Sequence, residues 1–147
     1  MKTVAEILKE KGDQAVHSIG PEASVFEAVA LMAQKNIGAL LVMEGGRIVG
    51  VLSERDYARK VVLMARSSKD TPLREIMTSS VIYVHPSQSS EECMAVMTEN
   101  RVRHLPVLDN EDRLIGLISI GDLVKGIISE QKFIIEQLQH YISGERA

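Results

Sequence analysis

Two short segments of similar pattern carry the residues best suited to chemistry in this chain. They read Gly50-Val51-Leu52-Ser53-Glu54-Arg55-Asp56 and Gly116-Leu117-Ile118-Ser119-Ile120-Gly121-Asp122. In each, an apolar run ends at a serine and an aspartate follows three residues later. This spacing is typical of a helix start, where the serine oxygen accepts a backbone N–H and the carboxylate lies in the positively polarised first turn. Helix capping is therefore the simplest interpretation of both segments.

The same local geometry would also suit a nucleotide. Free N–H groups at a helix N-terminus bind phosphate, and the hydroxyl of Ser53 or Ser119 would add a donor. The carboxylate of Asp56 or Asp122 could accept both hydroxyl hydrogens of a ribose diol. Phosphate and sugar binding is thus a second hypothesis for the same residues.

Positive charge precedes the second segment but not the first. Arg101-Val102-Arg103-His104-Leu105-Pro106 leads into an apolar strand pattern and suits phosphate oxygens, although a solvated loop is the alternative. The equivalent Asn36-Ile37-Gly38-Ala39 is uncharged, and its small residues would let a flat ring approach the backbone. Arg55, Arg59 and Lys60 could supply the missing charge, with simple solvation as their default. Two such sites should therefore differ in affinity or preference.

These segments belong to a longer internal repeat. Val16–Asp56 matches Val81–Asp122, with Pro21 aligned with Pro86 and a one-residue insertion at a turn. Two similar units in one chain predict two similar folds packed about a pseudo-twofold axis.

Each repeat predicts the order β-α-β-β-α, an α/β (α+β) fold. The expected strands are Val16–Ile19, Leu40–Met43 and Arg47–Leu52 in the first copy, and Val81–Val84, Leu105–Leu108 and Arg113–Ile118 in the second. Ser24, and Ser89 or Ser90, suit the N-caps of the intervening helices. Gly45-Gly46 predicts a tight hairpin turn, and a further helix begins at Ser53 or Ser119.

The remaining segments complete the expected organisation. We predict an N-terminal helix within 1–15 that ends near Gly12, the first repeat at 16–64 and a linker at 65–72. The second repeat spans 73–126 and opens on a helical lead at Leu73–Met77. A C-terminal helix at 127–147 carries an apolar stripe, which could cover the N-terminal helix or pack against a second chain.

Composition limits the partners. Of the 147 residues 45% are hydrophobic and 25% charged, as in ordinary globular proteins, and the net charge is −3. Acidity and an aromatic content of 3% argue against nucleic acid. No apolar run is long enough for a membrane span, and the first residues do not form a signal peptide. A single cysteine, Cys93, inside an apolar helical pattern predicts a core residue and a reducing cytoplasm.

Catalysis and metal binding find little support in the sequence. The histidines at 17, 85, 104 and 140 lack metal-ligand spacing, and Cys93 has no evident activating partner. No phosphate-binding glycine motif of the Walker or dinucleotide type is present. We therefore predict no catalytic residues, no metal site and no catalytic cofactor.

The tandem pattern resembles the cystathionine β-synthase (CBS) domain family. The resemblance rests on Val-x-x-Ile-x-Pro and Val-x-x-Val-x-Pro at the repeat starts, the paired hairpin strands, the two Gly-x-x-Ser-x-x-Asp endings and Arg-His-Leu-Pro-Val at 103–107. It covers Val16 to Gly126. It implies a Bateman module, in which two repeats pack through their sheets around two clefts for adenosyl ligands, and two modules often form a disc-like dimer.

The resemblance also assigns roles to individual positions. Asp56 and Asp122 would bind ribose, and Ser53 and Ser119 would contact phosphate. Residues expected to enclose adenine are Val16, Ser18, Ile37, Gly38 and Ala39 in copy one, and Val81, Tyr83, Val102, Arg103, His104 and Pro106 in copy two. Arg55, Arg101 and Gly121 flank these segments and complete the predicted ligand site. Tyr83 departs from the small hydroxyl residue common in the family and would alter the adenine pocket or stack on the ring, whereas Ser18 for threonine is a mild change.

The expected function is a non-catalytic sensor of AMP or a related ligand such as ADP, ATP or NAD. It would work as a homodimer on an unidentified target protein, without nucleic acid or membrane. An interaction scaffold with empty clefts is the alternative.

Overall fold

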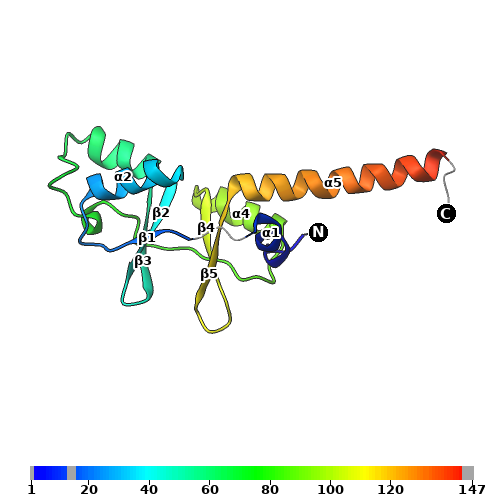
Figure 1. Cartoon of the computed structure of the whole chain (residues 1–147), viewed down its shortest axis with the longest axis horizontal. Helices are drawn as coiled ribbons and strands as arrows, with labels where there is room; N and C mark the ends of the chain where they lie inside the picture. Colours follow the sequence, from blue (N-terminus) through cyan, green and yellow to red (C-terminus); the bar gives the residue numbers. More distant parts are fainter. Residues whose placement is uncertain (1, 13–15, 144–147) are drawn as a thin grey trace. The chain divides into compact units, whose positions relative to one another are not determined.

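The computed structural model describes residues 2–12 and 16–143 and divides them into two compact units. The first unit is Val16–Val81, and the second combines Ile82–Ala147 with the N-terminal segment Met1–Ala15. Figure 1 shows helices and strands in both, which confirms the mixed α+β class.

The first unit is built on a three-stranded sheet. Strands β1 (Ser18–Ile19), β2 (Ala39–Glu44) and β3 (Arg47–Ser53) lie in the order β1-β2-β3, with β1 parallel and β3 antiparallel to β2. The β2–β3 turn uses Gly45 and Gly46 at φ 58° and 78°, the left-handed values that glycine adopts without strain. The hairpin predicted around these glycines is confirmed.

Helices complete the first unit. They are α2 (Val25–Lys35), α3 (Glu54–Tyr57), a π-helical turn η1 (Ala58–Val62) and a 3-10 turn η2 (Leu73–Glu75). The Ser24 hydroxyl accepts the Glu27 N–H at 3.1 Å, as the sequence predicts, and Asn36 ends α2 in a left-handed conformation. Val25, Ala28 and Met32 turn to the core, because they recur at helical spacing.

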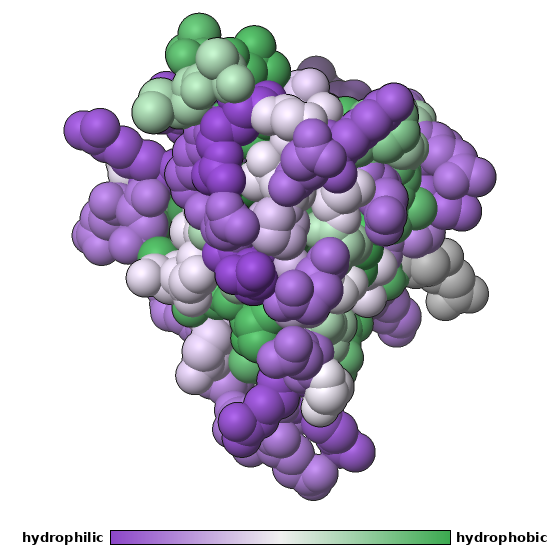
Figure 2. Space-filling model, turned by 90° about the vertical axis from the view of Figure 1, so that its left-hand side faces the viewer, coloured by the Kyte–Doolittle hydropathy of each residue, from purple (hydrophilic) through white to green (hydrophobic). Residues whose placement is uncertain are grey.

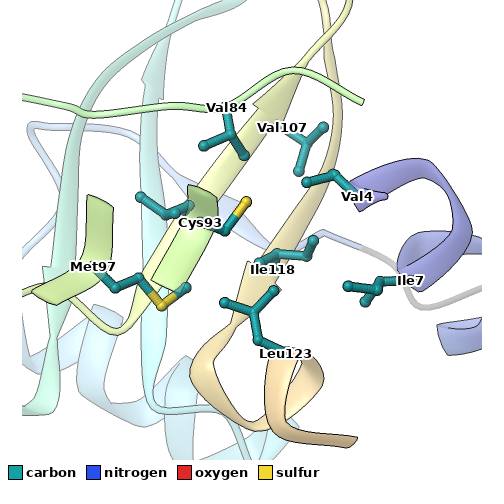
Figure 3. Packing of buried hydrophobic residues seen from close by; sticks show 9 residues of the cluster. Val4, Ile7, Val84, Cys93, Met97, Val107, Ile118 and Leu123 are labelled. Carbon is teal, nitrogen blue, oxygen red and sulfur yellow. The ribbon is translucent and has the colours of Figure 1, made fainter. Parts of the chain in front are cut away.

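The second unit repeats the hairpin with a shorter sheet. Its elements are α1 (Val4–Lys11), α4 (Ser90–Asn100), β4 (His104–Leu108), β5 (Leu114–Ser119) and α5 (Ile120–Ser143). The strand predicted at Val81–Val84 is reduced to one parallel bridge between Val84 and Val107. Ser89, rather than Ser90, caps α4. Figure 3 shows the core, in which Val4 and Ile7 of α1 approach Cys93, Ile118 and Leu123.

The segment that connects the two repeats, residues 65–81, packs with the first repeat. The Val25 N–H donates to the Thr71 carbonyl at 2.9 Å, and Leu73 and Ile76 lie in the first unit's core. Residues 65–81 therefore pack against the first repeat, although the sequence repeat suggests that 73–77 leads into the second.

Helix α5 is continuous through position 127, where the sequence predicts the start of a separate helix. Gly126 does not break it. A Cβ at Gly126 would lie 3.3 Å from Ile7 Cγ1, so the glycine permits close packing of α1 on α5. Helix α1 ends at Gly12, as predicted, while positions 1, 13–15 and 144–147 of the two predicted terminal helices lie outside the described residues.

The face of the molecule drawn in Figure 2 is largely polar. Figure 2 shows a mainly hydrophilic face with a hydrophobic group at its upper edge, and the large exposed apolar side chains of the first unit are Phe26, Val62, Leu63 and Met64. None of the helices in the described ranges combines the length and apolarity needed to cross a membrane.

Candidate functional site

The first Ser-x-x-Asp segment forms a capped corner between β3 and α3. The Asp56 N–H donates to Ser53 Oγ at 3.1 Å, while the Ser53 N–H and hydroxyl both donate to Asp56 Oδ2 at 3.0 Å. This reciprocal pair is a capping box. We refer to Ser53–Asp56 as the first corner; its capping interpretation is confirmed.

Two further side chains hold the first corner's carboxylate. Thr78 donates its hydroxyl to Asp56 Oδ1 at 3.2 Å. The Lys60 ammonium lies 3.2 Å from the same oxygen and donates to the Ile76 carbonyl at 3.0 Å. Lys60, one of the cations predicted to supply charge to the first copy, thus reaches the corner, but it pairs with the aspartate.

The second corner, Ser119–Asp122, has the same backbone geometry at the junction of β5 and α5. The Ser119 N–H donates to Asp122 Oδ2 at 2.9 Å, and the Asp122 N–H donates to Ser119 Oγ at 3.1 Å. Its lysine comes from a distant part of the sequence. Lys11 of α1 places its ammonium 2.9 Å from Asp122 Oδ2 and 2.9 Å from the Leu117 carbonyl oxygen.

The two repeats therefore neutralise equivalent aspartates with lysines from non-equivalent positions. Lys60 lies four residues after Asp56, and the residue four after Asp122 is Gly126. Because Gly126 lacks a side chain, α1 can pack closely there, and Lys11 takes over the contact with the carboxylate. In the second unit, α1 is a structural part of the corner.

The environment of Asp122 favours its ionised form. Burial by itself would raise the pKa of this carboxyl, but hydrogen bonds from Lys11 and Ser119, with the lysine's charge, hold the pKa below its ordinary value of 3.8. A carboxylate that stays ionised can accept two further hydroxyl groups only if lone pairs are open to them. Its Oδ2 atom is the one already shared by Lys11 and Ser119.

The contribution of the Lys11–Asp122 ion pair to the free energy of unfolding should depend on pH. A lowered folded-state pKa stabilises the protein above the ordinary carboxyl pKa, and that stabilisation is lost as the pH falls through the folded value. At pH 7 we expect Lys11→Met to lower the free energy of unfolding by about 1.5–3 kcal/mol, as for hydrogen bonds to charged groups. In urea denaturation from pH 7 to 3, the difference from wild type should shrink below about pH 4. A difference independent of pH would contradict the assignment.

Backbone pairing gathers the predicted ring-binding residues of copy one at the first corner. Ala39 lies opposite Ser53 in the β2–β3 register, and the Glu54 N–H donates to the Gly38 carbonyl at 3.1 Å. Ser18 lies beside Leu41 in the parallel β1–β2 pair, two residues along β2 from Ala39. The half-buried Val16 precedes that pair. Tertiary structure thus brings these separated segments together.

A cavity of about 300 Å³ opens next to the first corner. It lies between the end of α2 and the start of α3. Its lining residues are Val29, Met32, Ala33, Asn36, Ile37, Gly38, Glu54 and Tyr57. Two of the predicted adenine-contacting residues, Ile37 and Gly38, therefore border a space whose lining is mainly apolar and also includes Asn36 and Glu54.

The second corner gathers part of its predicted set. His104 lies opposite Ser119 in the β4–β5 register, and the Ile120 N–H donates to the Arg103 carbonyl at 2.9 Å. Val102 is half-buried and precedes this pair. Its N–H donates to the Met97 carbonyl at the C-terminal end of α4. The backbone arrangement of copy one is thus reproduced.

Other predicted residues of copy two lie differently. Pro106 is buried, and its carbonyl accepts the Val84 N–H at 3.0 Å. The Tyr83 ring packs edge-to-face against the His85 ring, with the two centroids 5.7 Å apart. Val81 ends the first unit, whereas Tyr83 lies in the second.

The flanking residues in the predicted site are exposed. Arg55 and Gly121 lie on the surface of the first helical turns after each corner, and Arg101 is the left-handed C-cap of α4 at φ 55°. Arg103 is also exposed, so its guanidinium is open to solvent beside the second corner while its carbonyl is bonded.

Sequence reasoning missed Lys11, Thr78, Glu54 and Tyr57 as neighbours of the corners. Glu54 carried a weak signal, because it lies inside the repeated segment. Lys11 and Thr78 lie outside the aligned repeats, so the comparison of the two copies gave no reason to consider them.

The single cysteine, Cys93, is buried in the core of the second unit. Burial, with a smaller contribution from the Glu92 charge, raises the pKa of Cys93 to about 11, so its thiol is neutral at pH 7. Within residues 2–12 and 16–143, no three His, Cys, Asp or Glu side chains are placed to hold a metal ion.

Comparison with known proteins agrees with this architecture. The CBS domain family matches twice, at residues 3–63 and 73–129. The chain belongs to the CBS-domain family and contains two copies of the domain. A CBS domain-containing protein of Arabidopsis thaliana, CBSX3, which is mitochondrial, is 37% identical over 97% of this chain and 72% of its own length.

Solved structures show the same fold. A putative signal-transduction protein with CBS domains from Burkholderia ambifaria is 59% identical, with a TM-score of 0.85 over 88% of this chain and 96% of that one. The CBS domain pair of protein MJ0100, in complex with 5-methylthioadenosine and S-adenosyl-L-methionine, is 23% identical, with a TM-score of 0.74 over 88% of this chain and 98% of that one. At that identity the likeness concerns the fold.

Proposed function

We propose that this protein is a non-catalytic sensor of adenine nucleotides, and that each corner binds the ribose of AMP or a related adenosyl ligand through its aspartate. The observation that carries the proposal is the repeated geometry of the two corners. In both, an N-cap serine and an aspartate lie beside the backbone segment expected to hold the base, joined to it by one N–H to carbonyl hydrogen bond.

The cavity beside the first corner supports this proposal. Its apolar wall at Ile37 and Gly38 suits a flat ring, and it adjoins the helix start that would face the sugar and phosphate. A domain pair of this fold holds adenosyl compounds in MJ0100. In this chain, the serine hydroxyl, the aspartate carboxylate and the helix-start N–H groups of each corner would bind the phosphate and the ribose.

Ligand binding has to compete with the internal contacts of the aspartates. Asp56 Oδ1 is shared by Thr78 and Lys60, and Asp122 Oδ2 by Ser119 and Lys11. A ribose diol would take remaining lone pairs or displace an ammonium group. Binding would thus be coupled to the lysine contacts, and through Lys11 to α1. A ligand that prefers the rearranged state shifts the population towards it, which is the physical basis of a sensor.

The satisfied carboxylates also favour a second candidate function. If capping and lysine pairing are their whole role, the protein is an interaction scaffold that binds no nucleotide. The single cysteine, buried and neutral, suits either function in a reducing compartment such as the cytoplasm.

Thermal unfolding separates the two candidates. A ligand at 100 times its dissociation constant stabilises the folded state by about 2.7 kcal/mol. For a chain of 147 residues that corresponds to an upward shift in Tm of roughly 9 °C. We expect AMP, ADP, ATP or NAD at millimolar concentration to give such a shift, with inosine monophosphate as the matched control for the adenine ring. No shift with any adenosyl ligand would favour the scaffold.

A further inference from the structure

The C-terminal half of α5 presents an apolar stripe to solvent. Figure 1 shows this part of the helix extending beyond α1 and α4, with no other described element of its unit beside it. Ile128, Ile134, Ile135 and Leu138 are 49–55% exposed, and Ile142 is 82% exposed. Large side chains left this open along one helix indicate an interaction surface.

The spacing of the stripe is that of a coiled coil. Positions 124, 127, 131, 134, 138 and 141 follow alternating steps of three and four residues, and they hold Val, Ile, Gln, Ile, Leu and Tyr. Ile128, Ile135 and Ile142 extend the stripe on one side at intervals of seven. A 3.5-residue repeat of this kind is expected where a helix packs along a second helix.

Gln131 favours an identical helix as the partner. It is the only polar residue among those six spaced positions. In a parallel pair of identical helices, Gln131 faces its own copy, and an amide can donate to and accept from another amide. In an antiparallel pair, or against an apolar groove, it would face apolar side chains and lose its hydrogen bonds.

Charge on the polar face argues against a membrane as the partner. Between positions 127 and 143 the charged residues are Glu130, Lys132 and Glu136. Helices that lie on anionic membranes carry many Lys or Arg residues on the polar face. The single lysine does not supply this attraction, and the small net charge leaves little repulsion between two copies.

We propose that residues 127–143 bind the same segment of a second copy of this chain as a parallel two-stranded coiled coil. Fully burying a Leu or Ile side chain removes on the order of 60–120 Å² from water. Because the stripe is about half exposed, two facing stripes would bury on the order of 500–800 Å². That area is below the roughly 1,000 Å² of a stable interface, so the dimer should be weak and depend on concentration.

Sedimentation of the full chain across about 1–300 µM tests the surface. We expect wild type to shift from monomer to dimer in this range. Leu138→Glu places a charge in the centre of the seam and should raise the dissociation constant at least ten-fold, whereas Ser129→Glu adds the same charge on the opposite face and should leave it unchanged. Unaltered circular dichroism would show that both variants fold.

Disulfide formation tests the parallel register. Gln131→Cys should form a cross-linked dimer under mild oxidation, because residue 131 faces itself, whereas Ser129→Cys should not. Wild type that stays monomeric at 300 µM, a dimer insensitive to Leu138→Glu, or equal cross-linking of both cysteine variants would overturn the proposal.

Discussion

Asp122→Ala should weaken AMP binding at the second corner by ten-fold or more. Hydrogen bonds that involve a charged group contribute about 1.5–3 kcal/mol, and the variant removes the carboxylate proposed to hold the ribose diol. The measurement is isothermal calorimetry with AMP, with parallel titration of Asp56→Ala. Each variant should lose one class of site and keep the other.

Two controls keep this result interpretable. Asp109→Ala removes a half-buried turn carboxylate that pairs with Arg113, and it should leave AMP affinity unchanged. Asp122→Ala also removes half of a helix cap and the partner of Lys11, so it should cost at least the roughly 1.5–3 kcal/mol expected for Lys11→Met, and folding must be verified by urea denaturation. A folded Asp122→Ala protein that binds AMP as wild type does would contradict the assignment of this residue.

Leu123→Ala should lower the free energy of unfolding by about 2–5 kcal/mol. Leu123 is fully buried beside Asp122 and shares a core cluster with Val4 and Ile7 of α1. Removing a buried leucine side chain loses its transfer free energy and leaves a cavity. The change should also loosen α1 and the Lys11 contact with the second corner.

The matched control for this prediction is Leu63→Ala, because Leu63 is 77% exposed. It should change stability by no more than about 0.5 kcal/mol. Urea denaturation of both variants at pH 7 measures the difference. Similar losses for the two leucines would show that the second unit's core is not organised as described.

Local patterns explain how much of the fold could be predicted. Ser24, the glycine pair at 45–46 and the apolar runs at 40–43 and 105–108 act through their neighbours in sequence, and the elements they predict are present. Local patterns could not predict whether residues 81–84 form a full strand. Their backbone pairing depends on where Val84 meets Val107 in the folded unit, and only one bridge forms.

The candidate site was predictable only where it lies within the repeat. The Ser-x-x-Asp corners were found because two copies could be compared, and register then placed Ala39 and His104 opposite the capping serines. The lysines that pair with the two aspartates could not be predicted by comparing the two copies. Lys60 in η1 reaches Asp56 in the preceding α3 because the two residues are four apart in sequence. Lys11 reaches Asp122 only because α1 packs across Gly126, a tertiary contact that no local pattern encodes.

The most direct test of the nucleotide-sensor proposal is a calorimetric comparison of AMP with 2′,3′-dideoxy-AMP, which keeps the base and phosphate but lacks the diol. If Asp56 and Asp122 bind the ribose hydroxyls, AMP should bind and the dideoxy compound should bind at least ten-fold more weakly. Equal affinities for the two compounds would contradict the role of the aspartates.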